Sequence, residues 1–152
     1  PICLQASGVK VQQEVLDTFQ EIKTNHCYRY LLFGFVNNDK EIGVLKKAPA
    51  DATYNEFIED LKDSVNRKVG CYAVYDLVFE FEESKQKRSR LVFVSWGPDG
   101  IPIRQKMLIA SSKVELKNKL QGIFKELQAS GIDEASEECM LELCRQGDRG
   151  AN

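Results

Sequence analysis

Basic side chains recur at helical spacing in the stretch that follows Trp96. Lys106, Lys113 and Lys117 are seven and four residues apart, so a helix would place them one above the other. Apolar residues would lie on both flanks of these lysines, on one side Ile109, Leu116, Leu120 and Ile123 and on the other Met107, Ala110 and Val114. Such a cationic ridge suits an acidic, partly apolar partner. A core helix whose lysine stems cover apolar neighbours fits the same spacing.

Residues that carry out acid–base or metal chemistry are sparse. His26 is the single histidine, and its position at a predicted helix end favours a capping or surface role over catalysis. No phosphate-binding glycine motif occurs, and no base is near Ser111 and Ser112 in the sequence. Zinc needs about four Cys or His ligands at regular spacing, which the chain lacks. We therefore predict a binding protein rather than an enzyme, with no catalytic residues, metal or cofactor.

Length and composition set the class of protein. A chain of 152 residues with 43% hydrophobic and 29% charged residues suits one domain with one core. The net charge of −2 does not suggest a nucleic-acid binder. No apolar run approaches the roughly 20 residues that span a bilayer. We expect a cytoplasmic monomer forming a single domain over 1–152, with a mobile N-terminal arm at 1–8 and a frayed end at 147–152.

The number and spacing of the cysteines indicate whether the protein resides in an oxidising or a reducing compartment. They are odd in number and irregular in spacing, and none forms a Cys-x-x-Cys pair: Cys3, Cys27, Cys71, Cys139 and Cys144. With no signal peptide in view, this usage favours free thiols in a reducing compartment.

Periodicity in the first half predicts two helices and a hairpin. Apolar residues at helical spacing predict a helix over 12–23, and strands over 28–36 and 41–47 flank turn residues at 37–40. Thr53 followed by Glu56 resembles a capping box, which would begin a second helix.

The second half predicts the elements that would position the ridge. A long strand over 71–81 is followed by a charged hairpin tip at 82–90 and an apolar strand over 91–96, expected to be buried on both faces. Gly97-Pro98-Asp99-Gly100 is a turn, and Pro102 would lie in the first turn of the long helix, which Gly122 ends. A short strand over 124–129 and a helix over 133–144 complete an α+β fold, with a mixed five- to six-stranded sheet flanked on both faces by helices.

Several separated motifs, in order, carry a family resemblance over about residues 6–146. The chain resembles the actin-depolymerising factor/cofilin family in Ala6-Ser7-Gly8-Val9, in Cys71-Tyr72-Ala73-Val74-Tyr75-Asp76, in Leu91-Val92-Phe93-Val94-Ser95-Trp96-Gly97-Pro98-Asp99 with Pro102-Ile103-Arg104-Gln105-Lys106-Met107, and in Gly122-Ile123-Phe124-Lys125-Glu126-Leu127-Gln128-Ala129. This resemblance implies the actin-depolymerising-factor homology fold, related to that of gelsolin. It also implies binding to actin monomers and filaments, preferably with ADP, and filament severing and depolymerisation at the cytoskeleton.

The resemblance also implies roles for individual residues. Positions matching the monomer-binding site are Ser7, Gly8, Val9, Arg104, Lys106, Met107, Lys113, Lys117 and Lys119. Positions resembling the filament site are Arg88, Arg90, Glu142 and Arg145. Ser7 matches a serine that is phosphorylated in many members, and three helix lysines match positions for phosphoinositide headgroups: Lys113, Lys117 and Lys119.

Two departures leave an alternative open. Five residues precede the Ala6-Ser7 motif, and the last helix has Arg145 as its only basic residue before Gly147. A homology-fold module could instead bind Arp2/3, as glia maturation factor does, or bind filaments without severing them, as coactosin does. The Ala6-Ser7-Gly8-Val9 motif and the basic residues Arg104 and Lys106 favour the severing protein.

Overall fold

One mixed sheet of six strands forms the centre of the chain. The computed structural model describes residues 8–80 and 85–150. The strand order is β1-β3-β2-β4-β5-β6, in which β1 and β6 pair in parallel with their neighbours and the other pairs are antiparallel. The strands are β1 (Lys10–Val11), β2 (Tyr28–Val36), β3 (Glu41–Pro49), β4 (Cys71–Glu80), β5 (Lys87–Trp96) and β6 (Lys125–Ala129).

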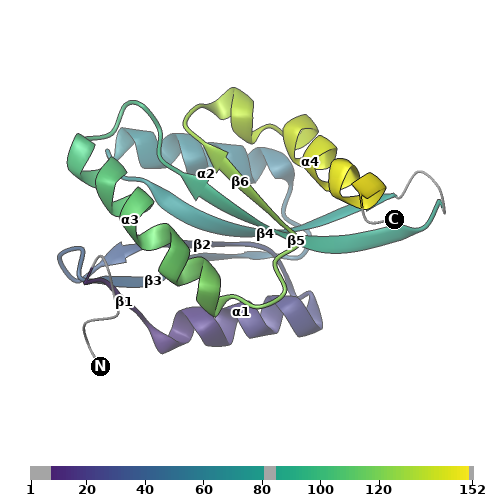
Figure 1. The fold of residues 1–152 in the computed structure, drawn as a ribbon, viewed down its shortest axis with the longest axis horizontal. Coiled ribbons are helices and arrows are strands. Elements are labelled where there is room, and N and C mark those ends of the chain that lie inside the picture. Colours follow the sequence, from purple (N-terminus) through teal and green to yellow (C-terminus); the bar gives the residue numbers. More distant parts are fainter. Residues whose placement is uncertain (1–7, 81–84, 151–152) are drawn as a thin grey trace.

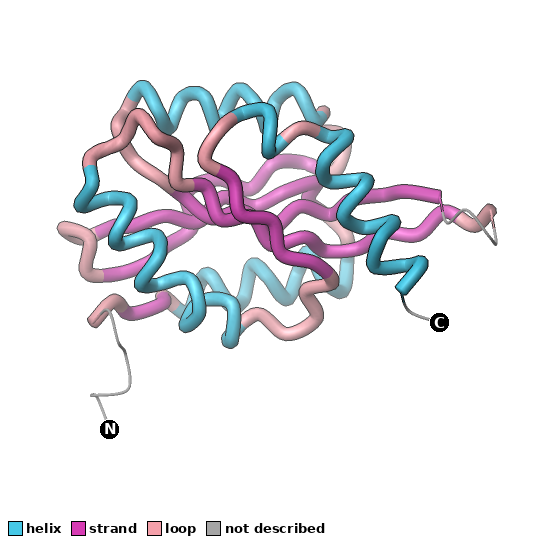
Figure 2. The backbone as a smooth tube through the Cα atoms, turned by 45° about the horizontal axis from the view of Figure 1, so that its top comes forward, coloured by secondary structure: helices cyan, strands magenta, loops and turns pink. Residues whose placement is uncertain are grey.

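Helices cover both faces of this sheet (Figure 1). One face packs against α1 (Gln13–Asn25) and α3 (Ile103–Lys119). The other face packs against α2 (Tyr54–Asn66), the short helix η2 (Ile132–Ala135) and α4 (Glu137–Gly150). Figure 2 shows the strands enclosed between the two layers. The predicted α+β fold, with a mixed sheet between helices, is confirmed.

Alternation along β4 explains why there are two cores. Tyr72 and Val74 belong to the apolar cluster under α1 and α3, whereas Ala73 and Tyr75 belong to the cluster under α2 and α4. Successive side chains of a strand point to opposite faces, so a nearly continuous apolar run fills both. The partner strand β5 is buried throughout its predicted range, Leu91 to Trp96.

Several predicted local structures are confirmed. The Thr53 side chain accepts from the Glu56 N–H, and the Glu56 carboxylate accepts from the Thr53 N–H, which completes the capping box of α2. The turn between β2 and β3 has positive φ at Asn37, Asn38 and Asp39, residue types that tolerate this conformation. His26 caps the C-terminus of α1 in a left-handed conformation, with φ of 52°.

Several boundaries differ from prediction, four of them by more than a shift of one or two residues at an end. The strand β1 was missed, because two residues are too short to show a period. The predicted charged tip at 82–90 is wrong over 87–90, which belong to β5, while 82–84 lie outside the described residues. The predicted helix at 133–144 is two helices, because Ser136 breaks it and its hydroxyl accepts from the Cys139 N–H at 3.2 Å. The end predicted to fray from 147 is helical as far as Gly150.

Trp96 and Gly70 fix the point from which α3 departs. The Trp96 indole is 1% exposed, and its Nε1–H donates to Ser64 Oγ at 2.8 Å and to the Leu61 carbonyl at 3.2 Å. Gly70 lies so close that a Cβ there would be 2.7 Å from both the Trp96 carbonyl oxygen and Ile109 Cγ1. The end of β5 and the middle of α3 are therefore held close to the start of β4.

Candidate functional site

The buried side of α3 fixes how the helix presents its other residues. Ile109, Ser112 and Leu116 are buried against the sheet. The Tyr72 hydroxyl of β4 donates to the Ile109 carbonyl at 2.6 Å in the interior. A hydrogen bond between a buried strand residue and the helix backbone limits rotation of the helix about its axis. The opposite surface of α3 therefore faces outward in a defined orientation.

An apolar stripe runs along that outward surface. It consists of Ile103, Met107, Ala110 and Val114, which recur at spacings of four, three and four. Ile103 is 76% exposed, Met107 65% and Val114 60%. These three are among only five large hydrophobic residues exposed in the described parts of the chain. Of the two predicted apolar strips, one is thus core and the other is an exposed surface typical of a binding site.

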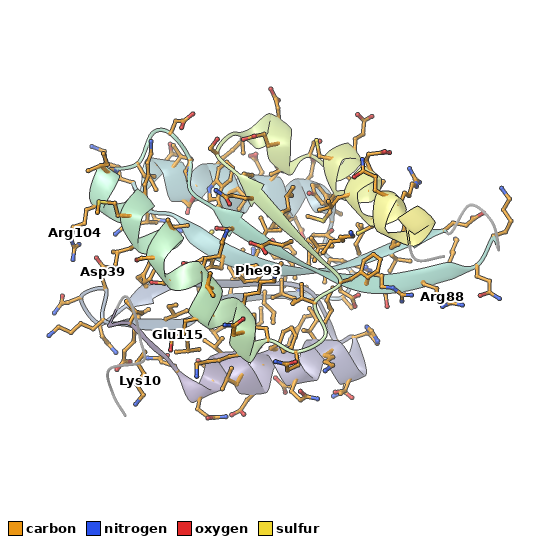
Figure 3. All side chains as sticks on the ribbon, in the orientation of Figure 1. Lys10, Asp39, Arg88, Phe93, Arg104 and Glu115 are labelled. Atoms are coloured by element: carbon orange, nitrogen blue, oxygen red, sulfur yellow. The ribbon has the colours of Figure 1, made fainter. Side chains whose placement is uncertain are left out.

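Basic residues at the start of α3 lie on either side of the stripe. Arg104 lies beside Asp39 of the β2–β3 turn (Figure 3), with its Nη1 2.7 Å from Asp39 Oδ2. Lys106 Nζ is 3.7 Å from Asp99 Oδ1. Cations are disfavoured at a helix N-terminus, where the dipole is positive, and α3 has no acidic residue in its first turn. The side chain of Arg104 is 70% exposed, so it is available to a partner. A basic residue in the first turn of a helix lowers stability locally, and such a cost is typical of a surface used for binding.

The other ridge lysines share one carboxylate. Glu126 on β6 has Oε1 at 3.2 Å from Lys113 Nζ and Oε2 at 2.7 Å from Lys117 Nζ. Lys113 also donates to Gln128 Oε1 at 3.1 Å. Partial burial raises the pKa of Glu126, but the hydrogen bonds and charges of the two lysines outweigh it, so the pKa lies below its ordinary value. The ridge is therefore partly neutralised along β6.

This shift predicts a dependence of stability on pH. Because the folded-state pKa of Glu126 is lowered, its ion pairs stabilise the fold above the ordinary carboxyl pKa, and this contribution is lost as pH falls through the lowered value. We expect E126Q to reduce the free energy of unfolding by about 0.5–1 kcal/mol at neutral pH. The difference in unfolding free energy from wild type should start to shrink as the pH falls below the ordinary carboxyl pKa, about 4.3, and should vanish below the lowered pKa of Glu126. Urea unfolding at neutral pH and over this acidic range tests this, and a difference that stays constant would contradict it.

Lys119 and the N-terminal residues are placed differently from the ridge. Lys119 is exposed at the end of α3, about 200° around the helix from Lys117 at about 100° per residue. Ser7 lies outside the described residues. Gly8 is exposed with φ of +73°, which favours glycine. Val9 is only 3% exposed and packs in the core, so a contact of this residue with actin would have to use its backbone.

The predicted filament residues lie at the opposite end of the molecule from Arg104. Arg88 and Arg90 pair in register with Phe79 and Leu77 of β4, which places all four on the face covered by α4. Figure 3 shows Arg88 on the projecting β4–β5 hairpin, far from Arg104. Arg90 also lies over the Phe124 ring, 5.3 Å from its centroid.

Helix α4 supplies the remaining predicted filament residues. Glu142 is exposed and accepts from Gln146 Nε2 at 3.4 Å. Arg145 is half-buried, with its Nε enclosed in the protein. Phe79 of β4 and Cys144 of α4 share one apolar cluster, so α4 packs against the base of the hairpin. The structure thus brings the four predicted filament residues to one end.

The described residues do not form a catalytic or metal-binding site. His26 Nδ1 lies 2.8 Å from Oδ2 of the buried Asp76 carboxylate, so the ring is held in a structural hydrogen bond. Burial raises the pKa of Cys71 to about 12 and that of Cys144 to about 11, so neither thiol supplies a thiolate near neutral pH. In the described ranges, no three His, Cys, Asp or Glu residues could hold a metal ion, and no helix is long and apolar enough to cross a membrane.

Sequence reasoning missed several residues of the site. Ile103 continues the apolar stripe, and its spacing of four from Met107 could have revealed it. Asp39 and Glu126, which hold the basic residues, are distant in sequence and left no local signal. A cleft of about 370 Å³ beside the ridge was also unforeseen, and its walls include Lys106, Lys113, Gln128, Ser130 and Glu134.

Comparisons with known proteins agree with this architecture. The family described as "Cofilin/tropomyosin-type actin-binding protein" matches residues 8–145. Cofilin of Saccharomyces cerevisiae is 36% identical over 145 residues, which cover 95% of this chain and 97% of that protein. Cofilin of Schizosaccharomyces pombe is 39% identical over 136 residues, covering 90% and 94%. The crystal structure of Streptomyces griseoflavus cofilin superposes with a TM-score of 0.82 at 34% identity, covering 92% of this chain and 99% of that one.

The match extends over most of the chain in both sequence and fold, which establishes the protein family. The chain belongs to the family of cofilin/tropomyosin-type actin-binding proteins.

Proposed function

We propose that this protein binds actin monomers and filaments, prefers ADP-actin, and severs and depolymerises filaments in the cytoplasm. The observation that carries the proposal is the exposed apolar stripe of α3 between Arg104 and Lys106, in a chain of this family. Burial of Met107 and Val114 would supply binding energy, because exposed apolar area removed from water is favourable. The two basic residues would orient the helix on an acidic actin surface.

The opposite end would contact a second actin subunit. Arg88 of β5 lies far from Arg104 of α3 along the molecule (Figure 3), and α4 packs at the base of the same hairpin. One protein molecule could then contact two neighbouring subunits of a filament. If it binds one filament twist better than another, mass action shifts the filament toward that twist. Strain at boundaries between bound and bare segments would then promote severing.

Three further assignments belong to this proposal. Ser7 would be a phosphorylation site, where added negative charge near the basic start of α3 would oppose binding of acidic actin. Lys113, Lys117 and Lys119 would contact phosphoinositide headgroups. The protein would act as a monomer, without catalysis or a cofactor.

Co-sedimentation with ADP-actin filaments tests the proposal. We expect the protein to pellet with the filaments and to raise the amount of soluble actin, with shorter filaments visible by fluorescence microscopy. The apolar-stripe variant M107A/V114A should bind roughly 30-fold more weakly, since each truncated anchor costs about 1 kcal/mol or more. Binding that leaves filament lengths unchanged would support a non-severing module, and the absence of both pelleting and monomer binding would reject the proposal.

A further inference from the structure

Glu126 occupies the position that a bound anion would take between two lysines. Each of its carboxylate oxygens faces one ammonium group, Oε1 facing Lys113 at 3.2 Å and Oε2 facing Lys117 at 2.7 Å. Lys117 keeps 42% of its side chain exposed and Lys113 keeps 24%. The cluster therefore carries two positive charges and one negative charge, and solvent reaches both lysines.

We propose that Lys113, Lys117 and Glu126 form an anion-exchange site, in which a phosphate monoester displaces Glu126 as the counter-ion of the lysines. The ligand class is a dianionic phosphate monoester, such as the headgroup of a phosphoinositide. The inference deepens the proposed phosphoinositide binding and rests on it. Nothing in the family match assigns a role to Glu126.

The chemistry of the exchange favours phosphate over weaker anions. A phosphate monoester carries a charge of about −1.5 to −2 and three acceptor oxygens, whereas the carboxylate of Glu126 carries one charge. A dianion gains more from the two lysines than Glu126 loses, because the displaced carboxylate can be hydrated. A singly charged phosphodiester, as in phosphatidylserine, offers no such advantage. Glu126 would therefore act as a selectivity filter for dianionic groups.

The surroundings provide room and a further cation. The cleft of about 370 Å³ has Lys113 in its wall. Lys106, which precedes Lys113 by seven residues on α3, lines the same cleft. Gln128 lines the same cleft and could donate a hydrogen bond to a phosphate oxygen, whereas the Ser130 hydroxyl already donates to the carboxylate of Glu134 in the same wall. A phosphate leaving the Glu126 position on this side would still meet a positive charge.

Binding to phosphatidylcholine vesicles that contain a phosphoinositide bisphosphate tests the exchange. We expect E126Q to bind about fivefold more tightly than wild type, because both lysines become available. The matched control is E115Q, which removes the same charge from α3 about 200° around the helix from Lys113. This control should change binding by less than about twofold. In the K113Q/K117Q background, E126Q should have no effect.

Two additional arms define the ligand and separate the hypotheses. E126Q should raise the affinity for phosphatidylserine vesicles by a larger factor than the affinity for bisphosphate vesicles. Binding of soluble inositol trisphosphate shows whether the lipid surface is needed. Equal gains from E126Q and E115Q, or a gain that persists without the lysines, would overturn the exchange site while phosphoinositide binding stands. Failure of wild type and every variant to bind either phosphate probe would reject both proposals.

Discussion

The variant R104E/K106E is expected to bind actin monomers about 100-fold more weakly than wild type, because two attractive contacts become repulsive and like charges across an interface cost several kcal/mol. Its fold should persist. The substitution of Arg104 removes the ion pair with Asp39, but an acidic residue in the first turn of α3 is favoured by the helix dipole. Fluorescence titration of ADP-actin measures the affinity, and circular dichroism measures the fold.

A matched control separates local charge from net charge. The variant K47E/K62E changes the net charge equally through exposed lysines on β3 and α2, and it should bind within about twofold of wild type at physiological salt, where exposed charges are screened. If both double variants lose the same affinity, the contact at the start of α3 is wrong. If R104E/K106E binds as wild type does, the basic residues beside the stripe serve solubility alone.

The second large effect is on stability. W96A is expected to lower the free energy of unfolding by about 4 kcal/mol, since the indole is fully buried and its removal leaves a cavity. The loss also deprives Ser64 of the indole donor inside the core. Urea unfolding followed by circular dichroism measures the change as a lower midpoint at an unchanged slope.

A milder substitution tests the physical cause. W96F keeps an aromatic ring but lacks the Nε1–H donor to Ser64 Oγ and the Leu61 carbonyl, so we expect a loss of about 1–2 kcal/mol beyond any small change in packing. Equal losses in W96A and W96F would mean that hydrogen bonding, rather than volume, dominates. A loss below about 1 kcal/mol in W96A would contradict the role of Trp96 as the anchor of β5.

Burial made most of the fold predictable. Strands β2, β4 and β5 carry long apolar runs because the sheet is covered on both faces, and the capping residues Thr53 and Glu56 mark the start of α2. The basic start of α3 was predictable from the turn before it and from Pro102, which forms the N-cap. The family motifs extended these predictions to residues on different elements.

The missed features depend on contacts between distant parts of the chain. Strand β1 exists because Lys10 and Val11 pair with Glu41 and Ile42 of β3, which no local pattern shows. The start of β5 carries charged residues because the hairpin projects beyond the helices, so no burial pattern marks it as a strand. Glu126 was overlooked for a similar reason, since its two lysines belong to another element.

The short strand β1 bears on the phosphorylation that we propose at Ser7. The Lys10 N–H donates to the Lys40 carbonyl at 3.0 Å, next to Asp39, the partner of Arg104. Ser7 precedes Lys10 by three residues, which span at most about 10 Å. A phosphate on Ser7 would therefore be joined to β1 by a short linker, which sets its effective concentration around the β2–β3 turn at roughly millimolar. Such a tethered anion would compete with actin for the basic residues without any change in the fold, to an extent set by its affinity for them as well as by its local concentration.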